Sequence, residues 1–301
     1  MNLSHLYYFT KLADLQHYNR AAKELYISQP SLTHAIKALE NELGVLLFER
    51  VGRRVVLTEF GRKFSECVTR GLREIENGVS LAKEHRGTFG GKVNVGTIIT
   101  VQGDYLPALI HAYQTTYGES IKFSLHQAFS IPLIEGLDND EYDMVFSAKV
   151  QNRPDLCFEH VVSQELVVCV SNKNPLAQQK SLSLEDLRNQ RVYTYQRGTP
   201  LGEKVQEVLE DYSVKASQEF EDEITLGGMV AANPDICGLV VNTIGLKPFD
   251  NLAVLPIENL QKDFHRIYLV YKRNKFRSQA AESFLEFALD YARQNHRFSL
   301  G

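Results

Sequence analysis

Residues 19–43 have the sequence NRAAKELYISQPSLTHAIKALENEL, and this stretch decides the fold of the first part of the chain. It predicts two short helices joined by a tight turn. Asn19 is a suitable N-cap for the first helix and Ser28 for the second, where Pro30 fits the first turn because a missing N–H does little harm there. Gly44 follows the second helix, where a left-handed residue is favoured.

The second of these helices has one apolar and one polar face. Its apolar residues recur at the spacing of a single stripe on an α-helix: Leu32, Ile36, Leu39 and Leu43. Its early polar residues point away from that stripe: Gln29, Ser31, Thr33, His34 and Lys37. This arrangement predicts a helix-turn-helix whose second helix enters the major groove of DNA.

The stretch from Leu47 to Leu57 predicts a small β-hairpin. Gly52 suits its tight turn, and three arginines flank that turn: Arg50, Arg53 and Arg54. An ordinary solvated hairpin is the alternative, but beside a helix-turn-helix we favour a wing that lies along the DNA backbone. Residues 1–58 carry seven basic and five acidic side chains, while the whole chain has a net charge of −4, so the basic part is the one expected to touch phosphate.

Different side chains of this unit are expected to contact different parts of DNA. Ser28, at the start of the second helix, is expected to help seat a phosphate. The candidates for base edges are Gln29, Ser31, Thr33 and His34, where one good bidentate contact discriminates by roughly 1–3 kcal/mol. The candidates for phosphate are Arg20, Lys37, Arg50, Arg53 and Arg54. An ordinary surface histidine is the alternative for His34.

The residues from Ala21 to Gly61 resemble, without a gap, the DNA-binding domain of the LysR-type transcriptional regulators. The matching positions are Ala21-Ala22, Leu25, Ile27 to Thr33, Ile36, Leu39-Glu40, Leu43-Gly44, Leu47-Phe48, Arg50, Arg53, Leu57-Thr58 and Gly61. The chain departs from the family at Gln16-His17-Tyr18, where a Gly-Ser/Thr-Phe-like run is usual, and at His34, where Arg, Gln or Lys is common. The first departure is expected to alter a turn, and the second to alter which bases are read.

A long amphipathic helix is predicted from Thr58 to about His85. Its apolar stripe is Phe60, Phe64, Val68, Leu72, Ile75, Val79 and Ala82. We expect this stripe to pack on a second subunit, with packing against its own chain as the alternative. The resemblance implies the same: a linker helix that forms an antiparallel dimer. Gly71 and Gly78 weaken the helix, and Gly87, Gly90 and Gly91 are expected to mark its end and a hinge.

Residues 92–301 alternate between strand-like and helix-like segments. Strands are predicted at 92–97, 121–126, 144–147, 166–170, 191–195, 238–242 and 267–271, and helices at 105–117, 200–212, 224–232 and 278–296. This alternation favours helices packed on mostly parallel sheets. The sequence has no Gly-rich phosphate loop, Gly-x-Ser-x-Gly, His-Glu-x-x-His or Cys-x-x-Cys motif, so we predict no catalytic residue, metal or cofactor.

This second part resembles the LysR-type effector domain, which is built like a periplasmic binding protein, with two α/β subdomains around a ligand cleft. The resemblance rests on Gly96, Leu106-Pro107, Leu137, Asp143, Asn174 to Ala177, Leu184, Asp186-Leu187, Arg266, Leu269 to Lys272, Ser278, Ala280-Ala281 and Phe284. Asn233-Pro234-Asp235 departs from a usual Gly-x-Gly turn and is expected to change the cleft wall. The whole chain is thus predicted to be an α/β multidomain protein: a winged helix-turn-helix (1–58), a linker helix and hinge (59–88) and an effector domain (89–301). Its subdomains are expected at about 92–162 plus 267–301 and at about 163–266.

Clefts in such folds hold ligands with hydroxyls, helix N-termini and sometimes one cation. By this reasoning and by matching family positions, the effector-binding candidates are Thr97, Thr100, Ser130 (as an N-cap), Ser147 and Thr199. A capping or turn hydroxyl is the alternative for each. The expected effector is small and polar or anionic, with Arg197 as its countercharge.

Composition is compatible with a cytoplasmic protein. The sequence contains no run of 18 apolar residues, and its N-terminus lacks the basic and apolar segments of a secretion signal, so no membrane association is expected. Its four cysteines have no metal-binding spacing: Cys67, Cys157, Cys169 and Cys237. We expect reduced structural thiols, with a redox-sensing pair as the alternative.

The sequence therefore predicts a sequence-specific transcriptional regulator whose activity a small effector modulates. Its expected partners are double-stranded DNA with an inverted repeat, a second copy of the chain in a dimer or tetramer, and RNA polymerase. One alternative is a ligand-independent architectural DNA-binding protein. The other is an α/β enzyme with a DNA-binding head, for which no nucleophile and base can be named.

Overall fold

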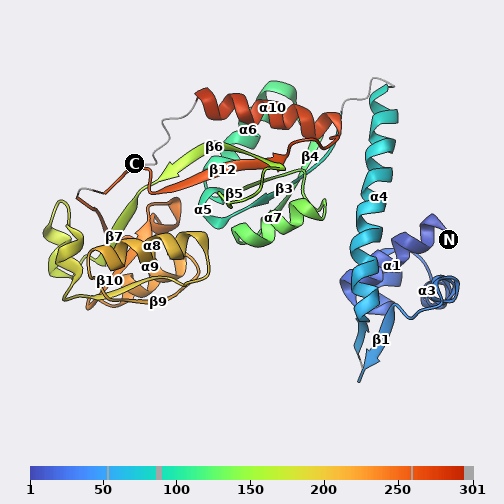
Figure 1. Ribbon diagram of the computed structural model, residues 1–301, viewed down its shortest axis with the longest axis horizontal. Coiled ribbons are helices and arrows are strands. Elements are labelled where there is room, and N and C mark those ends of the chain that lie inside the picture. Colours follow the sequence, from blue (N-terminus) through green and yellow to red (C-terminus); the bar gives the residue numbers. More distant parts are fainter. Residues whose placement is uncertain (53, 86–89, 259, 295–301) are drawn as a thin grey trace. The chain divides into compact units, whose positions relative to one another are not determined.

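The computed structural model of the chain describes residues 1–52, 54–85, 90–258 and 260–294. The chain divides into two compact units, Met1–Thr88 and Phe89–Gly301 (Figure 1). Arg53, predicted to contact phosphate, and Gly87, predicted to mark a hinge, lie outside the described residues. None of the described helices combines the length and hydropathy that a membrane span requires.

The amino-terminal unit has the predicted winged helix-turn-helix architecture. Its elements are α1 (Leu3–Leu15), α2 (Tyr18–Glu24), α3 (Gln29–Leu43), β1 (Phe48–Val51), β2 (Arg54–Leu57) and α4 (Glu59–His85). Strands β1 and β2 pair antiparallel, and Gly52 in their turn has φ +62°. The predicted hairpin and its glycine turn are thus confirmed.

The caps predicted for α3 are confirmed, but the cap predicted for α2 is not. The Ser28 hydroxyl accepts a hydrogen bond from the Ser31 N–H at 3.2 Å, and Gly44 ends α3 with φ +71°. The prediction that Asn19 caps α2 is wrong. The helix already begins at Tyr18, because His17 is extended and its Nδ1 accepts from the Arg20 N–H at 3.4 Å.

One apolar core holds the amino-terminal unit together. It joins the buried side chains of α1 with the predicted stripe of α3: Phe9, Leu12, Leu32, Ile36 and Leu39. Val68 and Leu72 of α4 belong to the same core and are 7% and 6% exposed. The prediction that the whole α4 stripe faces a partner helix is therefore wrong for these two residues, since α1 provides the surface on which they pack.

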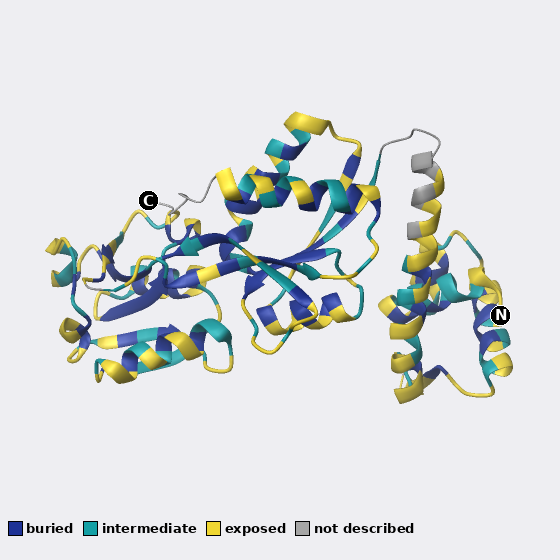
Figure 2. Ribbon diagram, turned by 45° about the horizontal axis from the view of Figure 1, so that its top comes forward, coloured by how far each residue is buried: buried dark blue, intermediate teal, exposed yellow. Residues whose placement is uncertain are grey.

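Much of the rest of the α4 stripe is exposed within this chain, although Phe64 is half-buried and packs beside Phe9. Phe60, Ile75 and Val79 are 45%, 45% and 51% exposed. Figure 2 shows exposed residues along much of α4. An apolar stripe that is half buried by its own unit and half uncovered leaves these three side chains as the part that a second subunit could still bury.

The second unit consists of two lobes, each with a five-stranded sheet. The first lobe has strand order β4-β3-β5-β12-β6. Its strands are β3 (Gly91–Thr97), β4 (Ile121–Gln127), β5 (Met144–Ala148), β6 (Leu156–Gln164) and β12 (His265–Lys272). Its helices are α5 (Ile99–Gln102), α6 (Tyr105–Tyr117), α7 (Ser130–Asp138) and α10 (Gln279–Gln294). Helices α6 and α10 lie on one face of the sheet and α7 on the other (Figure 1).

The second lobe has strand order β11-β7-β10-β8-β9. Its strands are β7 (Leu166–Ser171), β8 (Arg191–Tyr195), β9 (Ala216–Phe220), β10 (Ile236–Val241) and β11 (Leu252–Pro256). Its helices are α8 (Pro200–Asp211) and α9 (Glu223–Ala232), with short 3-10 turns η1 (Pro175–Gln178), η2 (Leu184–Leu187) and η3 (Ile244–Leu246). Each lobe has its own apolar core.

The expectation of mostly parallel sheets is wrong, because both sheets are mixed. Strand β12 runs antiparallel to β5 and β6, and β7 runs antiparallel to β10 and β11. The reason lies in the connection between lobes: β6 ends at Gln164 and β7 begins at Leu166, so the chain passes straight from one sheet into the other. Strands β6, β9 and β11 were not predicted.

The two cysteines of the second lobe lie on adjacent strands but face opposite sides of the sheet. Cys169 pairs with Gly238, while Cys237 pairs with Val170, so neighbouring positions alternate between the faces. Burial raises the pKa of the Cys169 thiol to about 12 and that of Cys237 to about 11. This geometry favours structural thiols at these positions over a redox-sensing pair.

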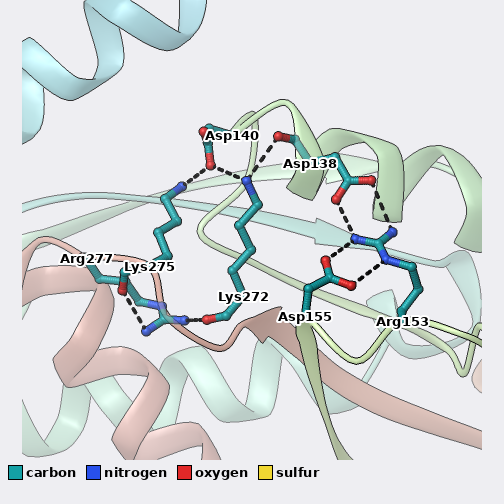
Figure 3. Close-up of polar contacts among 7 residues, drawn as sticks. All are labelled: Asp138, Asp140, Arg153, Asp155, Lys272, Lys275 and Arg277. Carbon is teal, nitrogen blue, oxygen red and sulfur yellow. Dashed lines mark hydrogen bonds and ion pairs between the residues drawn. The ribbon is translucent and has the colours of Figure 1, made fainter.

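Charged side chains from the end of α7, the loop before β6 and the end of β12 form a network of ion pairs in the first lobe (Figure 3). Asp140 accepts from Lys272 Nζ at 2.8 Å and from Lys275 Nζ at 2.7 Å. Beside it, Arg153 bridges Asp138 and Asp155. Burial opposes ionisation of Asp140, but the hydrogen bonds from the two lysines outweigh it and lower the pKa of this carboxyl.

Replacing Asp140 with asparagine should destabilise the first lobe by about 1–3 kcal/mol, because two partly buried ammonium groups lose their counter-ion. The lowered pKa means that this stability is present above the ordinary value of 3.8 and is lost as the pH falls through the native pKa. Urea denaturation of the wild type and of Asp140→Asn should therefore differ most near neutral pH and converge below pH 3.8. Asp290→Asn, in an exposed pair with Arg293, is the control and should stay within about 0.5 kcal/mol of the wild type.

Candidate nucleic-acid interface and ligand cavity

The polar face of α3 is accessible, as predicted from its periodicity. Gln29, Ser31, His34 and Lys37 are exposed, and Thr33 is half-buried. The Gln29 Nε2 donates to the Thr33 hydroxyl at 2.8 Å, and this hydroxyl donates to the Gln29 carbonyl at 3.0 Å. The two side chains thus orient each other along the helix surface, where a base edge could replace their mutual contact.

The described candidate phosphate contacts come from four different elements, with Lys37 on α3. Arg20 lies on α2, Arg50 on β1 and Arg54 on β2, and all three side chains are exposed. Ser28 is also exposed, at the N-terminus of α3. Exposed guanidinium groups on a wing and beside a helix N-terminus suit an anionic surface.

Glu40 fixes the wing to the recognition helix, and sequence reasoning did not single it out for this role. Its Oε1 accepts from the Leu47 N–H at 2.8 Å and from the Phe48 N–H at 3.2 Å. One carboxylate oxygen of α3 therefore holds the start of β1. The available signal was a glutamate next to Leu39 of the predicted apolar stripe. The other acid of α3, Glu42, is exposed.

A second contact holds the wing to α4. The Leu47 carbonyl accepts from the Thr58 N–H at 3.0 Å, and the Thr58 hydroxyl caps α4 by accepting from the Gly61 N–H at 2.9 Å. A Cβ on Gly61 would lie 2.1 Å from the Leu47 carbonyl oxygen. Only glycine allows α4 to approach the wing this closely.

A cavity of about 260 Å³ lies between the lobes of the second unit. The first lobe contributes residues that follow β3 and β4, the start of α7 and the start of β12. The second lobe contributes the end of β8, the start of α8 and the loop that leads into α9. The cavity therefore lies at the carboxyl ends of parallel strands, where ligands bind in open α/β sheets.

Three of the five predicted effector residues line this cavity: Thr100, Ser130 and Thr199. Thr100 is 5% exposed, and its hydroxyl has no hydrogen-bond partner among the described residues. Thr199 caps α8 by accepting from the Gly202 N–H at 3.0 Å. The prediction that Ser130 is an N-cap is wrong: Phe129 precedes α7, and the Ser130 hydroxyl accepts from the Ala148 N–H of β5 at 3.1 Å.

The other predicted residues lie elsewhere. Thr97 and Ser147 are fully buried, and their hydroxyls donate to the carbonyls of Ile98 and Ala148. They are not among the residues that line the cavity. Arg197 is not among them either, since its side chain is exposed and donates to Gln218 Oε1 at 2.5 Å.

The sequence did not single out a buried carboxylate and its phenol partner in the cavity wall. Glu223, 2% exposed, accepts from the Thr243 hydroxyl at 2.6 Å and from the Tyr195 hydroxyl at 3.4 Å. The Tyr195 oxygen in turn accepts from the Val241 N–H at 3.0 Å. Burial raises the pKa of Glu223, and it raises the pKa of Tyr195 well above its ordinary value. The sequence predicts a helix at 224–232, close to the start of α9, but it carries no signal that the acid at this start is buried.

The electrostatic character of the cavity differs from the expectation of a cationic countercharge. Glu221 and Glu223 both line it, and its described lining residues include no lysine or arginine. His265 also lines it, but burial, together with the nearby Lys204, lowers the pKa of this imidazole to about 4. At neutral pH the described side chains of the cavity are therefore neutral or acidic.

The departure at Asn233-Pro234-Asp235 does not change the cavity wall as expected. These residues are not among those lining the cavity. They form the turn that enters β10, where the Asn174 side-chain amide donates to the Pro234 carbonyl at 2.7 Å. The other end of β10, at Val241, contacts the cavity residue Tyr195.

Comparisons with known proteins match both units. The family profile of the bacterial regulatory helix-turn-helix proteins of the lysR family matches residues 3–62, and that of the LysR substrate binding domain matches residues 86–293. The uncharacterised HTH-type transcriptional regulator YybE of Bacillus subtilis is 30% identical, over 97% of this chain and 99% of its own.

Two solved structures share the fold. Full-length CbnR in complex with its target DNA has a TM-score of 0.76 at 23% identity, covering 97% of this chain and 100% of that chain. The effector-binding domain of QuiR in complex with shikimate has a TM-score of 0.63 at 25% identity, covering 69% of this chain and 99% of that chain.

Proposed function

The chain belongs to the LysR family of DNA-binding transcriptional regulators, and on this premise we propose which residues perform each part of that function. Residues 1–58 bind DNA, residues 59–88 link and dimerise the subunits, and residues 89–301 bind an effector. In α3, Gln29, Ser31, Thr33 and His34 contact base edges. Ser28, Lys37 and the described arginines Arg20, Arg50 and Arg54 contact phosphates, and we assign Arg53 the same role.

The observation that carries this proposal is the division of α3 into two faces. Leu32, Ile36 and Leu39 are at most 1% exposed, while the polar side chains near its N-terminus are accessible. The wing of the same unit carries Arg50 on β1 and Arg54 on β2. A helix so anchored presents its polar residues in a fixed register, which base-specific contact requires.

We further propose that the regulator acts as a dimer or tetramer on an inverted-repeat operator. The exposed apolar residues Phe60, Ile75 and Val79 of α4 support a helix-to-helix contact between subunits. Two-fold symmetry then places two α3 helices about one turn of DNA apart. We also propose that the protein acts on genomic DNA and on RNA polymerase in the cytoplasm, as a regulator rather than an enzyme.

The effector is proposed to bind in the cavity between the lobes. Thr100, Ser130 and Thr199 line it from both lobes, so a ligand there contacts both. Such a ligand favours one arrangement of the lobes, and a preference of about 1.4 kcal/mol shifts that equilibrium tenfold. Thr97 and Ser147 are proposed to support this site from within the first lobe rather than to touch the ligand.

Genomic DNA selection with the full-length protein tests the division of labour. Thr33→Ala/His34→Ala should still bind the selected inverted repeat but should relax the base preference within each half-site. Arg50→Ala/Arg54→Ala should lose affinity for all sequences alike. Its slope of log affinity against log salt should become shallower by about 0.9 for each lost phosphate contact.

Arg191→Ala/Lys215→Ala is a matched control, because both side chains are exposed and basic but belong to the second unit. This variant should keep both the motif and the salt slope. If the wild type enriches no motif and its binding follows salt alone, α3 is not a recognition helix, and the architectural alternative takes its place.

A further inference from the structure

The two lobes contribute electrically different groups to the cavity between them, and its acidic end and its opposite end are named by the lobe that forms each. The inference rests on the proposed role of this cavity as the effector site. We propose that its ligand is a small zwitterion of the amino-acid class, with its carboxylate at the first lobe and its ammonium group at the second. The two ends belong to different lobes, so a ligand of this kind bridges them.

The acidic end is formed by the loop that leads into α9. Glu221 is exposed at the cavity, and Glu223 is buried in its wall. The described residues of the lining include neither lysine nor arginine, so these carboxylates have no basic side chain beside them in the cavity. A ligand ammonium group supplies the missing counter-ion, whereas a purely anionic ligand would add a like charge at this end.

The opposite end is formed by the N-terminus of α7 in the first lobe. This helix of nine residues has no side-chain cap, because Phe129 stands at its N-cap position and the Ser130 hydroxyl accepts from β5 instead. Helices α8 and α9, by contrast, are capped by Thr199 and Asp222. The first turn of α7 therefore leaves the N–H groups of Ser130 and Ile131 available to an anion, whereas Pro132 has no N–H.

Thr100 provides an independent indication of a bound polar group. Its side chain lines the cavity and is 5% exposed, yet its hydroxyl oxygen has no hydrogen-bond partner in the described structure. A buried hydroxyl without a partner carries a cost that a ligand can remove. Thr100 follows β3 in the same lobe as α7, so its hydroxyl can donate to the carboxylate end.

Size and apolar surface limit the rest of the ligand. The volume of about 260 Å³ lies below the range of about 300–1,000 Å³ for sites of drug-sized molecules. Between the two polar ends the wall is largely apolar: Ile98, Ala128, Ala148, Leu201 and Phe220. An aliphatic or aromatic side chain of modest size fits this description better than a highly hydroxylated molecule.

The test uses the full-length protein and the twenty standard L-amino acids as probes. A thermal-shift screen should find at least one that stabilises the protein. For that amino acid, the amine without its carboxylate and the acid without its ammonium group should each bind about tenfold more weakly or worse in calorimetric titration, because each loses one charged contact.

Glu223→Gln and Glu221→Gln separate the ammonium contact from a merely structural effect. Each should weaken the amino acid about tenfold but should not weaken the deaminated acid, which loses no contact and is relieved of a like charge. Glu185→Gln, an exposed glutamate of the same lobe that does not line the cavity, is the control and should change neither affinity. Equal weakening of both ligands by Glu223→Gln would show only that the variant distorts the lobe, and the assignment of the ammonium contact would be overturned.

Shikimate, a carboxylate without an ammonium group, separates a failure of the zwitterion proposal from a failure of the proposed effector site. Shikimate or a deaminated acid that binds as tightly as any amino acid would overturn the zwitterion and leave the effector site standing. If neither shikimate nor any amino acid binds, while the DNA motif is still selected, the zwitterion and the proposed effector function both fail and DNA binding remains.

Discussion

Gly61→Ala should destabilise the amino-terminal unit by at least about 3 kcal/mol, because the new methyl group has no room. An added Cβ would lie 2.1 Å from the Leu47 carbonyl oxygen. That oxygen cannot move without breaking its hydrogen bond from the Thr58 N–H, which joins the wing to α4. Differential scanning calorimetry of the full-length protein should show the transition of this unit at a lower temperature, and affinity for the selected operator should fall with it.

Gly71→Ala is a matched control in the same helix. No atom lies within 4 Å of a Cβ added at Gly71, so alanine there should stabilise α4 by up to about 1 kcal/mol through its higher helix propensity. The two substitutions are chemically identical and should have opposite signs. Equal effects at both positions would mean that helix propensity, not the contact with Leu47, determines the outcome.

The amino-terminal unit was predictable because its information is local. Caps, a period of 3.6 residues and a glycine turn lie within a few residues of the elements that they define, as at Ser28, Gly44 and Gly52. The misplaced cap at Asn19 shows the limit of this reasoning, since His17 is a less common cap and a shift of two residues separates them. Tyr26, in the turn before α3 with φ +55°, gives no sequence signal of its left-handed backbone.

The division of the α4 stripe could not be read from periodicity. A uniform stripe shows that one side of a helix is apolar but not how much of that side its own domain covers. Helix α1 packs on Val68 and Leu72, yet Ile75 and Val79 remain open. Packing within the chain and the proposed contact between subunits therefore draw on one stripe, and only the placement of α1 separates the two parts.

The second unit was predictable in outline but not in detail. Long apolar strands such as β7 and β10 were found, whereas β9, with the sequence ASQEF, lacks both an apolar run and an alternating pattern. The cavity brings together residues as distant in sequence as Thr100, Glu223 and His265. Which hydroxyls face the cavity depends on how the two lobes close on it, so Thr100 and Ser147, both placed after or within strands, could not be separated beforehand.

Glu40→Ala should cost about 2–5 kcal/mol, because one carboxylate oxygen serves two backbone N–H groups. The Leu47 N–H lies 2.8 Å from Oε1 and the Phe48 N–H lies 3.2 Å from it. Leu47 is fully buried, and each unsatisfied buried donor costs about 1–3 kcal/mol. Urea denaturation should show this loss, and the variant should bind DNA more weakly even under conditions in which it remains folded, since the wing is no longer fixed to α3.

Glu40→Gln and Glu42→Ala define the cause of that loss. Glutamine keeps an acceptor oxygen but not the charge, so its cost should be roughly half that of alanine, because charge-assisted hydrogen bonds are about twice as strong as neutral ones. Glu42 lies on the same helix and, among the described residues, pairs only with the exposed N-terminus, so Glu42→Ala should change stability by no more than about 0.5 kcal/mol. If Glu40 holds the wing in place, Glu40→Ala should lower the affinity for DNA because Arg50 and Arg54 are no longer held against the phosphates. Combining it with Arg50→Ala/Arg54→Ala should therefore add little further loss, whereas independent effects would multiply.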